Sequence, residues 1–269
     1  MINEIIKDIE SKLNIIINDK DIHYYTEGAT ESIVFSINNK YLIKTLNDIE
    51  FNVQKDFLSL YKEEYYQKII YTNEKLKYIC YEYINGNKIT DYTVYNKEDI
   101  VKQIYNITSN YKQYNYDEYG YYLVDHKTWY QFLLDEVEYS KNRMTEIDMH
   151  IVYNSLDIIK EFNVDKYLIH GDFGVHNFLI DKSNIKVIDP MGLVGDPLYD
   201  FYFAILSNYS LFKDMEFDVI FKYFNRDYKY KKALLIVVYY IRMSRAYVYD
   251  KDNYDNYYKI FNLKLCTLN

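Results

Sequence analysis

Three residues, Asp172, Asn177 and Asp189, have the types and the spacing that phosphoryl transfer requires. They lie in the segments HGDFGVHN at 170–177 and VIDP at 187–190. Transfer of a γ-phosphoryl group to an alcohol needs a carboxylate near the hydroxyl, oxygen ligands for Mg²⁺, and cations or backbone amides along the phosphates. Mg²⁺ prefers hard oxygen donors and typically takes one or two carboxylates together with the phosphates. This set of side chains therefore indicates a kinase-type reaction, provided that the fold brings them together.

A short hairpin is expected to do so. Two apolar runs, 178–180 and 185–188, flank turn residues at 181–184, and this pattern predicts two paired strands. The second strand returns Asp189 toward Asn177, so that a carboxylate and an amide oxygen can share a metal ion. Asp172, at the start of the preceding loop, can then point at the acceptor. Taken singly, Asp172 or Asp189 is more often a turn residue or a helix cap than a catalyst, but the joint spacing favours the functional interpretation.

The pattern His-Gly-Asp-x4-Asn followed by Ile-Asp-Pro resembles the aminoglycoside phosphotransferase family, which shares the protein-kinase fold and includes choline-kinase-like and sugar-kinase-like relatives. The segment GDPLYD at 195–200 is similar to the residues after that family's metal-binding aspartate. The resemblance runs through both lobes in order, and its specific part spans about residues 168–204. It implies that Asp172 orients or deprotonates the acceptor hydroxyl, and that Asn177 and Asp189 hold Mg²⁺.

The same resemblance implies supporting roles for two neighbours. His170 is expected to pack or hydrogen-bond beneath the loop, and Asp200 is expected to anchor the backbone amides of that loop. Helix capping explains Asp196 and Asp200 equally well. His176 has no assigned role. Many relatives carry Trp or Lys after the residue that follows the metal-binding aspartate, whereas this chain has PMG at 190–192, so the acceptor side is less defined than the metal side.

On the nucleotide side, Lys44 ends the apolar segment YLIKT at 41–45. A charge in a half-buried strand costs free energy unless it meets a partner such as phosphate. By the resemblance, this lysine would contact the α- and β-phosphates and pair with a carboxylate on the next helix. Glu50 is the candidate partner, although Asn47-x-x-Glu50 also fits a capping box.

Two further segments are candidates for nucleotide contacts. Residues 26–32 are expected to form the loop that covers the phosphates, with Ser32 as a possible donor to a phosphate. The connection YEYING at 81–86 resembles a kinase hinge, in which backbone groups of about Glu82 to Ile84 would meet the adenine edge. Backbone recognition leaves little trace in a sequence, so both ATP and GTP stay open as donors.

The elements that must position these residues follow from hydrophobic spacing. A helix is expected at 2–17, a hairpin at 32–37 and 40–44 turning at Asn38-Asn39, a helix from residue 47 or 48, and strands at 67–71 and 77–83. Beyond residue 97 the pattern is mostly helical, with helices expected at 97–114, 126–143, 146–163, 198–212 and 230–248. These elements predict an α+β, protein-kinase-like two-lobed fold: a small β-rich nucleotide-binding lobe at 1–84 and a larger, mainly helical catalytic and substrate-binding lobe at 85–269.

Composition narrows the possible partners. A net charge of −8 and a pI near 5.2 argue against nucleic acid, since its binders carry basic patches. The two cysteines, Cys80 and Cys266, lack metal-ligand spacing and fit a reducing compartment. The N-terminus lacks the basic and apolar regions of a signal peptide, and the longest apolar run, 234–241, is too short to span a bilayer. We therefore expect a cytoplasmic protein that binds neither nucleic acid nor membrane.

The expected acceptor is a small, hydroxyl-bearing and cationic molecule, with an aminoglycoside antibiotic first, and choline, a sugar or an amino-sugar second. Acidic clusters in the helical part would attract a polyamine sugar, although each cluster taken alone is more often a solvated helix face. These clusters are 135–138, 214–218 and 250–255. A sugar ring could also stack on Trp129, Tyr130 or Tyr202, which are otherwise core or rim residues.

Two other classes remain open. A non-catalytic pseudokinase is disfavoured because the chain retains a base, two metal ligands and a phosphate-binding lysine together. A protein kinase is disfavoured because the sequence Gly-Asp-Pro at 195–197 comes soon after Asp189. This spacing leaves no extended activation segment ending in Ala-Pro-Glu.

Overall fold

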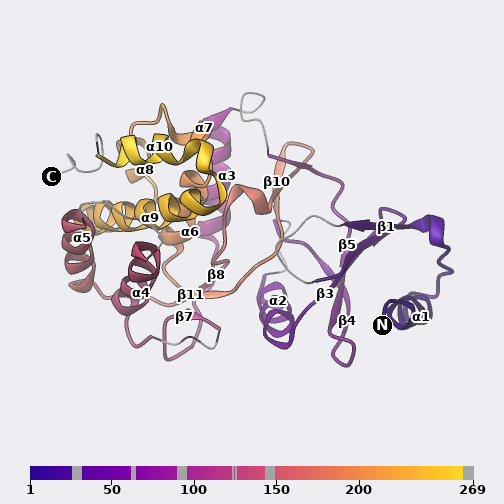
Figure 1. Ribbon diagram of the computed structural model, residues 1–269. Helices are drawn as coiled ribbons and strands as arrows, with labels where there is room; N and C mark the ends of the chain where they lie inside the picture. Colours follow the sequence, from indigo (N-terminus) through magenta and orange to yellow (C-terminus); the bar gives the residue numbers. More distant parts are fainter. Residues whose placement is uncertain are drawn as a thin grey trace. The chain divides into compact units, whose positions relative to one another are not determined.

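The computed structural model describes residues 1–25, 32–61, 65–89, 96–122, 124, 126–142 and 149–262. The chain forms two compact units, unit 1 (Met1–Lys88 and Phe178–Met191) and unit 2 (Ile89–Asn177 and Gly192–Asn269). Figure 1 shows a sheet accompanied by helices in unit 1 and mainly helices in unit 2. The segment 178–191, which the sequence assigned to the helical lobe, thus belongs to the strand-rich unit.

Unit 1 is built on a five-stranded antiparallel sheet whose strand order is β1-β2-β3-β5-β4. Its strands are β1 (Ile22–Tyr25), β2 (Val34–Ile37), β3 (Tyr41–Thr45), β4 (Ile69–Asn73) and β5 (Tyr78–Glu82). Asn38 and Asn39 join β2 to β3 with φ of 52° and 50°. Two consecutive left-handed residues make the type of turn that matches strand twist, and asparagine tolerates this conformation. The predicted hairpin is confirmed.

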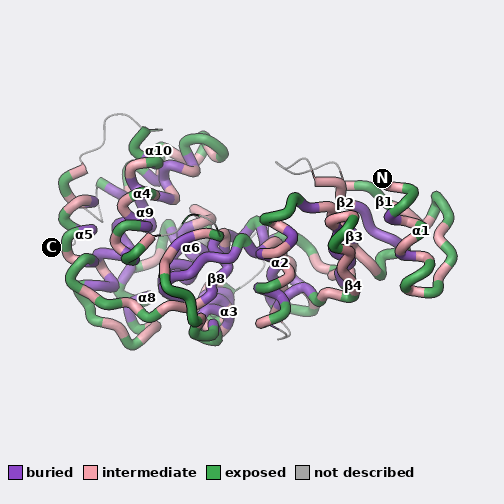
Figure 2. The backbone as a smooth tube through the Cα atoms, turned by 90° about the horizontal axis from the view of Figure 1, so that it is seen from below, coloured by how far each residue is buried: buried purple, intermediate pink, exposed green. Residues whose placement is uncertain are grey.

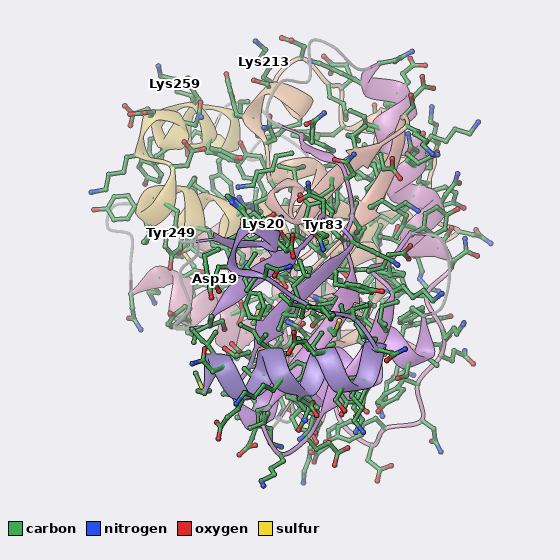
Figure 3. All side chains as sticks on the ribbon, turned by 90° about the vertical axis from the view of Figure 1, so that its right-hand side faces the viewer. Asp19, Lys20, Tyr83, Lys213, Tyr249 and Lys259 are labelled. Carbon is green, nitrogen blue, oxygen red and sulfur yellow. The ribbon has the colours of Figure 1, made fainter. Side chains whose placement is uncertain are left out.

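Two helices cover the two faces of this sheet. α1 (Ile2–Leu13) contributes Ile5 and Ile9 to a fully buried cluster that includes Tyr78 and Cys80 of β5. Burying each isoleucine contributes about 2 kcal/mol. α2 (Asp48–Leu60) lies on the opposite face, where the hydroxyl of Tyr81 donates to the side chain of Gln54. Successive β5 residues therefore serve opposite faces, as strand geometry requires, and Figure 3 views unit 1 from the side that α1 covers.

The segment 178–191 forms the predicted hairpin. β9 (Phe178–Asp181) pairs with β10 (Asn184–Val187), and Phe178 lies opposite Val187. β6 (Asn87–Lys88) adds to β9, and Tyr66 bridges to Val187. These backbone pairings tie the hairpin to residues from the first part of the chain, which explains its place in unit 1.

Unit 2 is organised around one long helix, α9 (Tyr228–Tyr249). Every residue from Leu234 to Ile241 within it is buried, so the longest apolar run of the sequence is a central core helix (Figure 2). The helices of unit 2 are α3 (Lys97–Ser109), α4 (Trp129–Lys141), α5 (His150–Lys160), α6 (Pro197–Leu206), α7 (Tyr209–Phe212), α8 (Asp218–Phe221), α9 (Tyr228–Tyr249) and α10 (Lys251–Ile260). Among the described residues, no helix combines the length and the apolar character needed to cross a membrane.

A small sheet positions the loop of interest. Its strands, in the order β7-β11-β8, are β7 (Gly120–Tyr121), β11 (Leu193–Gly195) and β8 (Tyr167–Ile169). β8 ends immediately before His170, and β11 leads directly into Asp196, the residue that caps α6 by accepting from the amide of Leu198 at 3.0 Å. The small sheet therefore places the start of the 170–177 segment, at the end of β8, beside the strand that leads into α6.

Candidate active site

The loop that begins at His170 is anchored through hydrogen bonds to Asp200, on the first turn of α6. The Asp200 carboxylate accepts the amide of His170 at 2.8 Å, the amide of Gly171 at 3.2 Å and the hydroxyl of Tyr111 at 2.8 Å. His170 is fully buried, and its Nδ1 accepts the amide of Asp172 at 3.2 Å. The expected anchoring role of Asp200 and the structural role of His170 are both confirmed.

Gly171 is required by the shape of this loop. Its φ is +83°, a conformation that side-chain-bearing residues rarely adopt. A Cβ at this position would lie 2.9 Å from the Cβ of Leu193 and 3.0 Å from the ring of Tyr121. The Tyr121 hydroxyl also donates to the Gly171 carbonyl at 2.9 Å. The glycine therefore lets Asp172 follow directly on a tightly packed turn.

Burial raises the pKa of Asp200 to about 7 from an ordinary value of 3.8, although the hydroxyl of Tyr111 and the amides of Gly171 and His170 act in the opposite direction. Desolvation outweighs these hydrogen bonds because no cation pairs with this carboxylate among the described residues. The loop is thus anchored by a carboxylate that is costly to ionise.

Replacement of Asp200 by asparagine is expected to remove a pH dependence of stability. A raised folded-state pKa stabilises the fold fully below about pH 4, and this contribution is lost as the pH rises through about 7. Between pH 5 and pH 8, the free energy of unfolding of Asp200→Asn should therefore gain about 2–3 kcal/mol relative to the unmodified protein. Urea denaturation at both pH values measures this difference. Parallel pH profiles for the two proteins would contradict the raised pKa.

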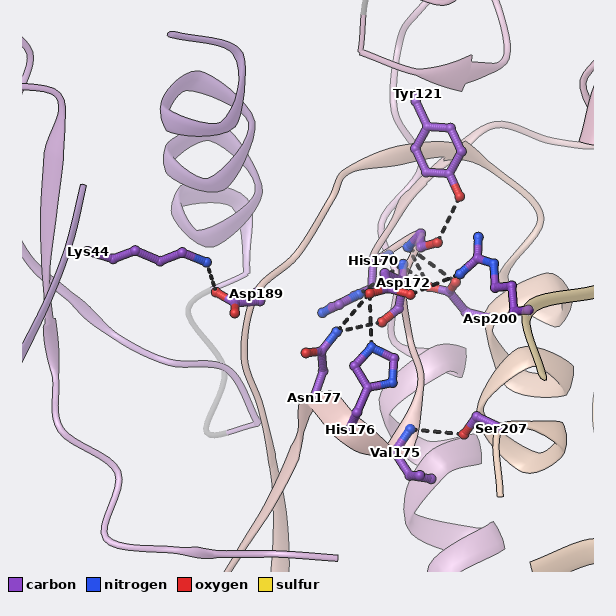
Figure 4. A network of polar contacts seen from close by, with 12 residues as sticks. Lys44, Tyr121, His170, Asp172, Val175, His176, Asn177, Asp189, Asp200 and Ser207 are labelled. Carbon is purple, nitrogen blue, oxygen red and sulfur yellow. Dashed lines mark hydrogen bonds and ion pairs between the residues drawn. The ribbon is translucent and has the colours of Figure 1, made fainter. Parts of the chain in front are cut away.

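Asp172 lies at the centre of a network of hydrogen bonds and ion pairs within unit 2 (Figure 4). Its Oδ2 is 3.0 Å from Nε2 of His176 and accepts Nδ2 of Asn177 at 3.2 Å, while Nη1 of Arg245 donates to Oδ1 at 3.1 Å. The Asp172 side chain is 22% exposed and that of His176 is 54% exposed. The carboxylate is fixed, yet part of it reaches solvent.

The charge state of Asp172 follows from this network. Burial alone would raise its pKa, but the hydrogen bond with His176 and the positive charge of Arg245 outweigh burial and hold the pKa well below its usual range. Asp172 is therefore ionised throughout the physiological range. Such a carboxylate is a strong hydrogen-bond acceptor and a weak base, which suits it to orienting a hydroxyl group.

In unit 1, Lys44 meets Asp189. The Lys44 ammonium lies 2.7 Å from Oδ1 of Asp189, with the lysine side chain 13% exposed and that of the aspartate 43% exposed. Asp189 has φ of 56°, a left-handed conformation that costs about 1 kcal/mol for a residue with a side chain. Strain of this kind is typical of functional positions. In this backbone conformation, the Asp189 carboxylate at the end of the hairpin contacts the Lys44 ammonium.

The expected pairing of Lys44 with Glu50 requires a correction. Glu50 and Asn47 form the capping box of α2: the Asn47 side chain accepts the Glu50 amide at 2.9 Å, and the Glu50 carboxylate accepts the Asn47 amide at 3.4 Å. The alternative interpretation of Asn47-x-x-Glu50, as a capping box, is therefore the one that the structure shows. Lys44 takes Asp189 because the two side chains face each other within unit 1, 145 residues apart in the chain.

The donor set fits a magnesium ion in chemical type. Nδ2 of Asn177 is used in hydrogen bonds to Asp172, whereas its amide oxygen accepts no hydrogen bond from any residue that the structure describes. In unit 1, the partly exposed Asp189 carboxylate offers oxygens of the same chemical type. Among described residues, no group of three or more His, Cys, Asp or Glu side chains is arranged to hold a metal ion by itself. Mg²⁺ typically takes one or two protein carboxylates together with water and phosphate ligands, so both groups are of a chemical type that it accepts.

The other predicted nucleotide contacts lie in unit 1. Ser32 borders a cavity of about 490 Å³ that Thr45, Asn47 and Glu50 also line, while residues 26–31 of the expected phosphate loop fall outside the described residues. The amide of Glu82 donates to Lys68 at 2.8 Å and its carbonyl accepts from Gln67 at 3.3 Å. The backbone of Glu82 is thus already engaged. Ile84 has no such contact with described residues, so it is the better candidate for an adenine edge.

The predicted acidic clusters bind partners of their own. Asp135 pairs with His126 at 2.8 Å, Glu138 accepts from Tyr153 at 2.5 Å, and Asp214 lies 3.6 Å from Lys97. Trp129 and Tyr202 are buried core residues, and the ammonium of Lys160 lies over the ring of Tyr130. These observations favour the solvated-face and core interpretations for these side chains.

Sequence reasoning missed two members of the Asp172 network. His176 was recognised as a position in the loop but was given no role. Arg245 lies on α9, 73 residues after Asp172, and its neighbours in the sequence belong to a mostly buried helix. The spacing of Arg242 and Arg245 on one helix face was a signal for two cations at one place, but nothing in the sequence indicates which carboxylate they face.

Solved structures of two kinds of small-molecule kinase have the fold of this chain. Choline kinase LicA from Streptococcus pneumoniae matches with a TM-score of 0.61 at 17% identity, covering 98% of this chain and 99% of that one. Aminoglycoside phosphotransferase APH(4)-Ia gives 0.60 at 15% identity, covering 97% and 96%. A thermostable mutant of the latter, in ternary complex with AMP-PNP and hygromycin B, gives 0.63 at 15% identity, covering 96% and 95%.

No protein-family model and no curated protein matches the sequence. At identities of 15–17%, the structural likeness defines the fold, which is that of aminoglycoside phosphotransferases and choline kinase. The predicted α+β, kinase-like fold class is confirmed.

Proposed function

We propose that this protein is a small-molecule kinase that transfers the γ-phosphate of ATP or GTP to a hydroxyl group. The observation that carries the proposal is the fixed, ionised carboxylate of Asp172, held by Arg245, His176 and Asn177 on a loop anchored at Asp200. A purely structural aspartate has no need of partial exposure in the middle of such a network. The shared fold supports the same class of reaction, since one protein of this fold has been solved in complex with AMP-PNP and hygromycin B.

Each site residue takes a role in this proposal. Asp172 accepts a hydrogen bond from the acceptor hydroxyl and aligns the hydroxyl oxygen with the γ-phosphorus. Because phosphoryl transfer passes through a loose transition state, alignment and charge neutralisation supply most of the rate. A carboxylate with a lowered pKa meets that need, since it is always in its accepting form.

Asn177 and Asp189 would hold Mg²⁺ through their side-chain oxygens. When bound, the ion neutralises charge on the β- and γ-phosphate oxygens. The hairpin register supports this assignment, because pairing of Phe178 with Val187 leaves Asn177 and Asp189 just beyond the paired ends of the two strands. Lys44 would exchange its contact with Asp189 for the α- and β-phosphates.

The remaining nucleotide contacts are assigned by position. Ser32 would donate to a phosphate from the end of the covering loop, and the backbone at Ile84, with Glu82 beside it, would meet the adenine edge. Glu50 contributes through its capping box, which fixes the start of the helix after β3.

The acceptor that we place first is an aminoglycoside, which would make the protein a cytoplasmic resistance enzyme. The motif at 170–189 resembles that family, and one protein of the same fold has been solved with hygromycin B. A metabolic alcohol is the second candidate, supported by the likeness to a choline kinase.

A coupled nucleotide-turnover assay tests the proposal. The protein is incubated with Mg²⁺ and ATP or GTP against a panel of aminoglycosides, choline, sugars and amino-sugars, and phosphorylated products are identified by mass spectrometry. Turnover stimulated by aminoglycosides alone would support a resistance kinase, and stimulation by another alcohol would support metabolism. Nucleotide binding without transfer to any acceptor would favour a pseudokinase and overturn the proposal.

A further inference from the structure

The contact between Arg245 and Asp172 joins the central helix of unit 2 to the candidate catalytic loop. Nη1 of Arg245 donates to Oδ1 of Asp172 at 3.1 Å, and the two side chains are 25% and 22% exposed. Charge-assisted hydrogen bonds are roughly twice as strong as neutral ones. Partial burial weakens the screening that reduces surface ion pairs to little value. This contact therefore has the strength to fix the orientation of the carboxylate.

Arg245 is itself held in place. Its guanidinium carbon lies 4.5 Å from the centre of the Phe203 ring on α6, and a planar guanidinium stacks well on an aromatic face. The helix that carries it, α9, is buried on both sides of this position at Ser244 and Ala246. The guanidinium is thus presented to Asp172 from a rigid part of the core.

The hydrogen bonds that Asp172 already accepts determine which of its oxygens is free. A carboxylate oxygen offers about two lone-pair positions. Oδ2 takes both Nε2 of His176 and Nδ2 of Asn177, at 3.0 Å and 3.2 Å. Among the residues that the structure describes, Oδ1 takes one donor, from Arg245. One position on Oδ1 is left to receive a hydroxyl group.

We propose that Arg245 is a positioning residue for Asp172. It holds Oδ1 of Asp172 so that the remaining lone pair of this oxygen accepts the hydrogen of the acceptor hydroxyl. This role rests on the proposed function. It assigns the oxygen of Asp172 that accepts the hydroxyl and gives Arg245 a role in the contact that it makes with this oxygen. Without it, the carboxylate rotates about its terminal torsion, which is soft, and the hydroxyl loses its alignment.

Arg242 offers a matched control for this role. It lies one helical turn before Arg245, and its guanidinium carbon is 4.8 Å from the same Phe203 ring. Within the described residues it forms no ion pair of the kind that joins Arg245 to Asp172. Replacement of either arginine by glutamine removes a cation from Phe203, but only one replacement removes a donor from Asp172.

The test compares Arg245→Gln, Arg245→Lys and Arg242→Gln in the whole protein. We expect Arg245→Gln to lower kcat for phosphate transfer by about 10- to 100-fold, as displacement of a catalytic group does, with the nucleotide KM unchanged. Arg245→Lys should recover part of the loss, because its ammonium keeps one donor for Oδ1. Arg242→Gln should transfer at close to the unmodified rate.

Two comparisons separate this role from a merely structural one. In an Asp172→Asn background, Arg245→Gln should cause no additional loss of kcat, since the two residues act as one unit. Thermal melting of all variants checks folding. Equal losses for Arg242→Gln and Arg245→Gln, or a wild-type kcat for Arg245→Gln, would overturn the positioning role while leaving the proposed function intact. Absence of transfer by the unmodified protein would overturn the proposed function and this role with it.

Discussion

Replacement of Asp172 by asparagine should leave only a small residual rate of phosphate transfer while leaving nucleotide affinity nearly unchanged. Asparagine conserves the size of the side chain and can still accept at Oδ1, but it carries no charge and presents an amide group toward His176 and Asn177. The acceptor hydroxyl then loses both its charged acceptor and its alignment. We expect kcat to fall by about 10³- to 10⁴-fold, the range over which such groups contribute, and Asp172→Ala should behave in the same way.

Nucleotide affinity serves as the second measurement, by titration of a fluorescent nucleotide in the presence of Mg²⁺. The residues to which we assign nucleotide contacts, Lys44, Ser32 and Ile84, belong to unit 1, whereas Asp172 belongs to unit 2. Asp157→Asn, on an exposed position of α5, controls for the loss of one negative charge. An equal fall in nucleotide binding and in transfer would show that Asp172 supports the fold and does not act on the acceptor.

The local parts of the site were predictable because short-range chemistry determines them. The loop at 170–177, the hairpin at 178–187 and the anchoring aspartate at 200 all follow from residue types at fixed spacings, and the structure forms each of them. The turn at Asn38-Asn39 belongs to the same class, since two residues that tolerate a left-handed backbone define it.

Element ends were less predictable, because hydrophobic spacing continues past the point where a helix stops. The apolar pattern of the first helix runs on to Ile17, yet the helix ends at Leu13. Asn14 takes the left-handed conformation that terminates helices, with φ of 52°. The strands of the small sheet in unit 2 were not predicted at all, since segments of two or three residues carry no periodicity.

Contacts between distant residues were beyond the sequence. Lys44 was expected to meet a carboxylate, and the nearest plausible one was Glu50, six residues away. The carboxylate that it meets is Asp189, and local capping already occupies Glu50. Arg245 was missed for the same reason: a residue on a central helix carries no sign of which loop its side chain supports. Charge pairing across long stretches of chain is decided by packing, which periodicity does not report.

Replacement of Asp189 by alanine should reverse the effect of magnesium on nucleotide binding. In the proposed site, Asp189 supplies the only carboxylate to the ion, and it also contacts the Lys44 ammonium at 2.7 Å. Its removal therefore weakens binding of the magnesium-bound nucleotide, by about 10- to 100-fold, as loss of a metal-site carboxylate or its support typically does. The same change releases Lys44 to meet phosphate, so the affinity for metal-free nucleotide should hold or rise.

Titration of one nucleotide with Mg²⁺ and again with EDTA measures the two affinities. The decisive quantity is the affinity with Mg²⁺ divided by the affinity with EDTA. The ratio should exceed one for the unmodified protein and approach or fall below one for Asp189→Ala. Asp181→Ala, at the end of β9 in the same hairpin, is the matched control and should keep the unmodified ratio. If Asp189→Ala retains the full effect of magnesium, Asp189 is not a metal ligand. Its contact with Lys44 would then serve only to fasten the hairpin to the sheet of unit 1, because an ion pair needs no metal to stabilise the two strands that it joins.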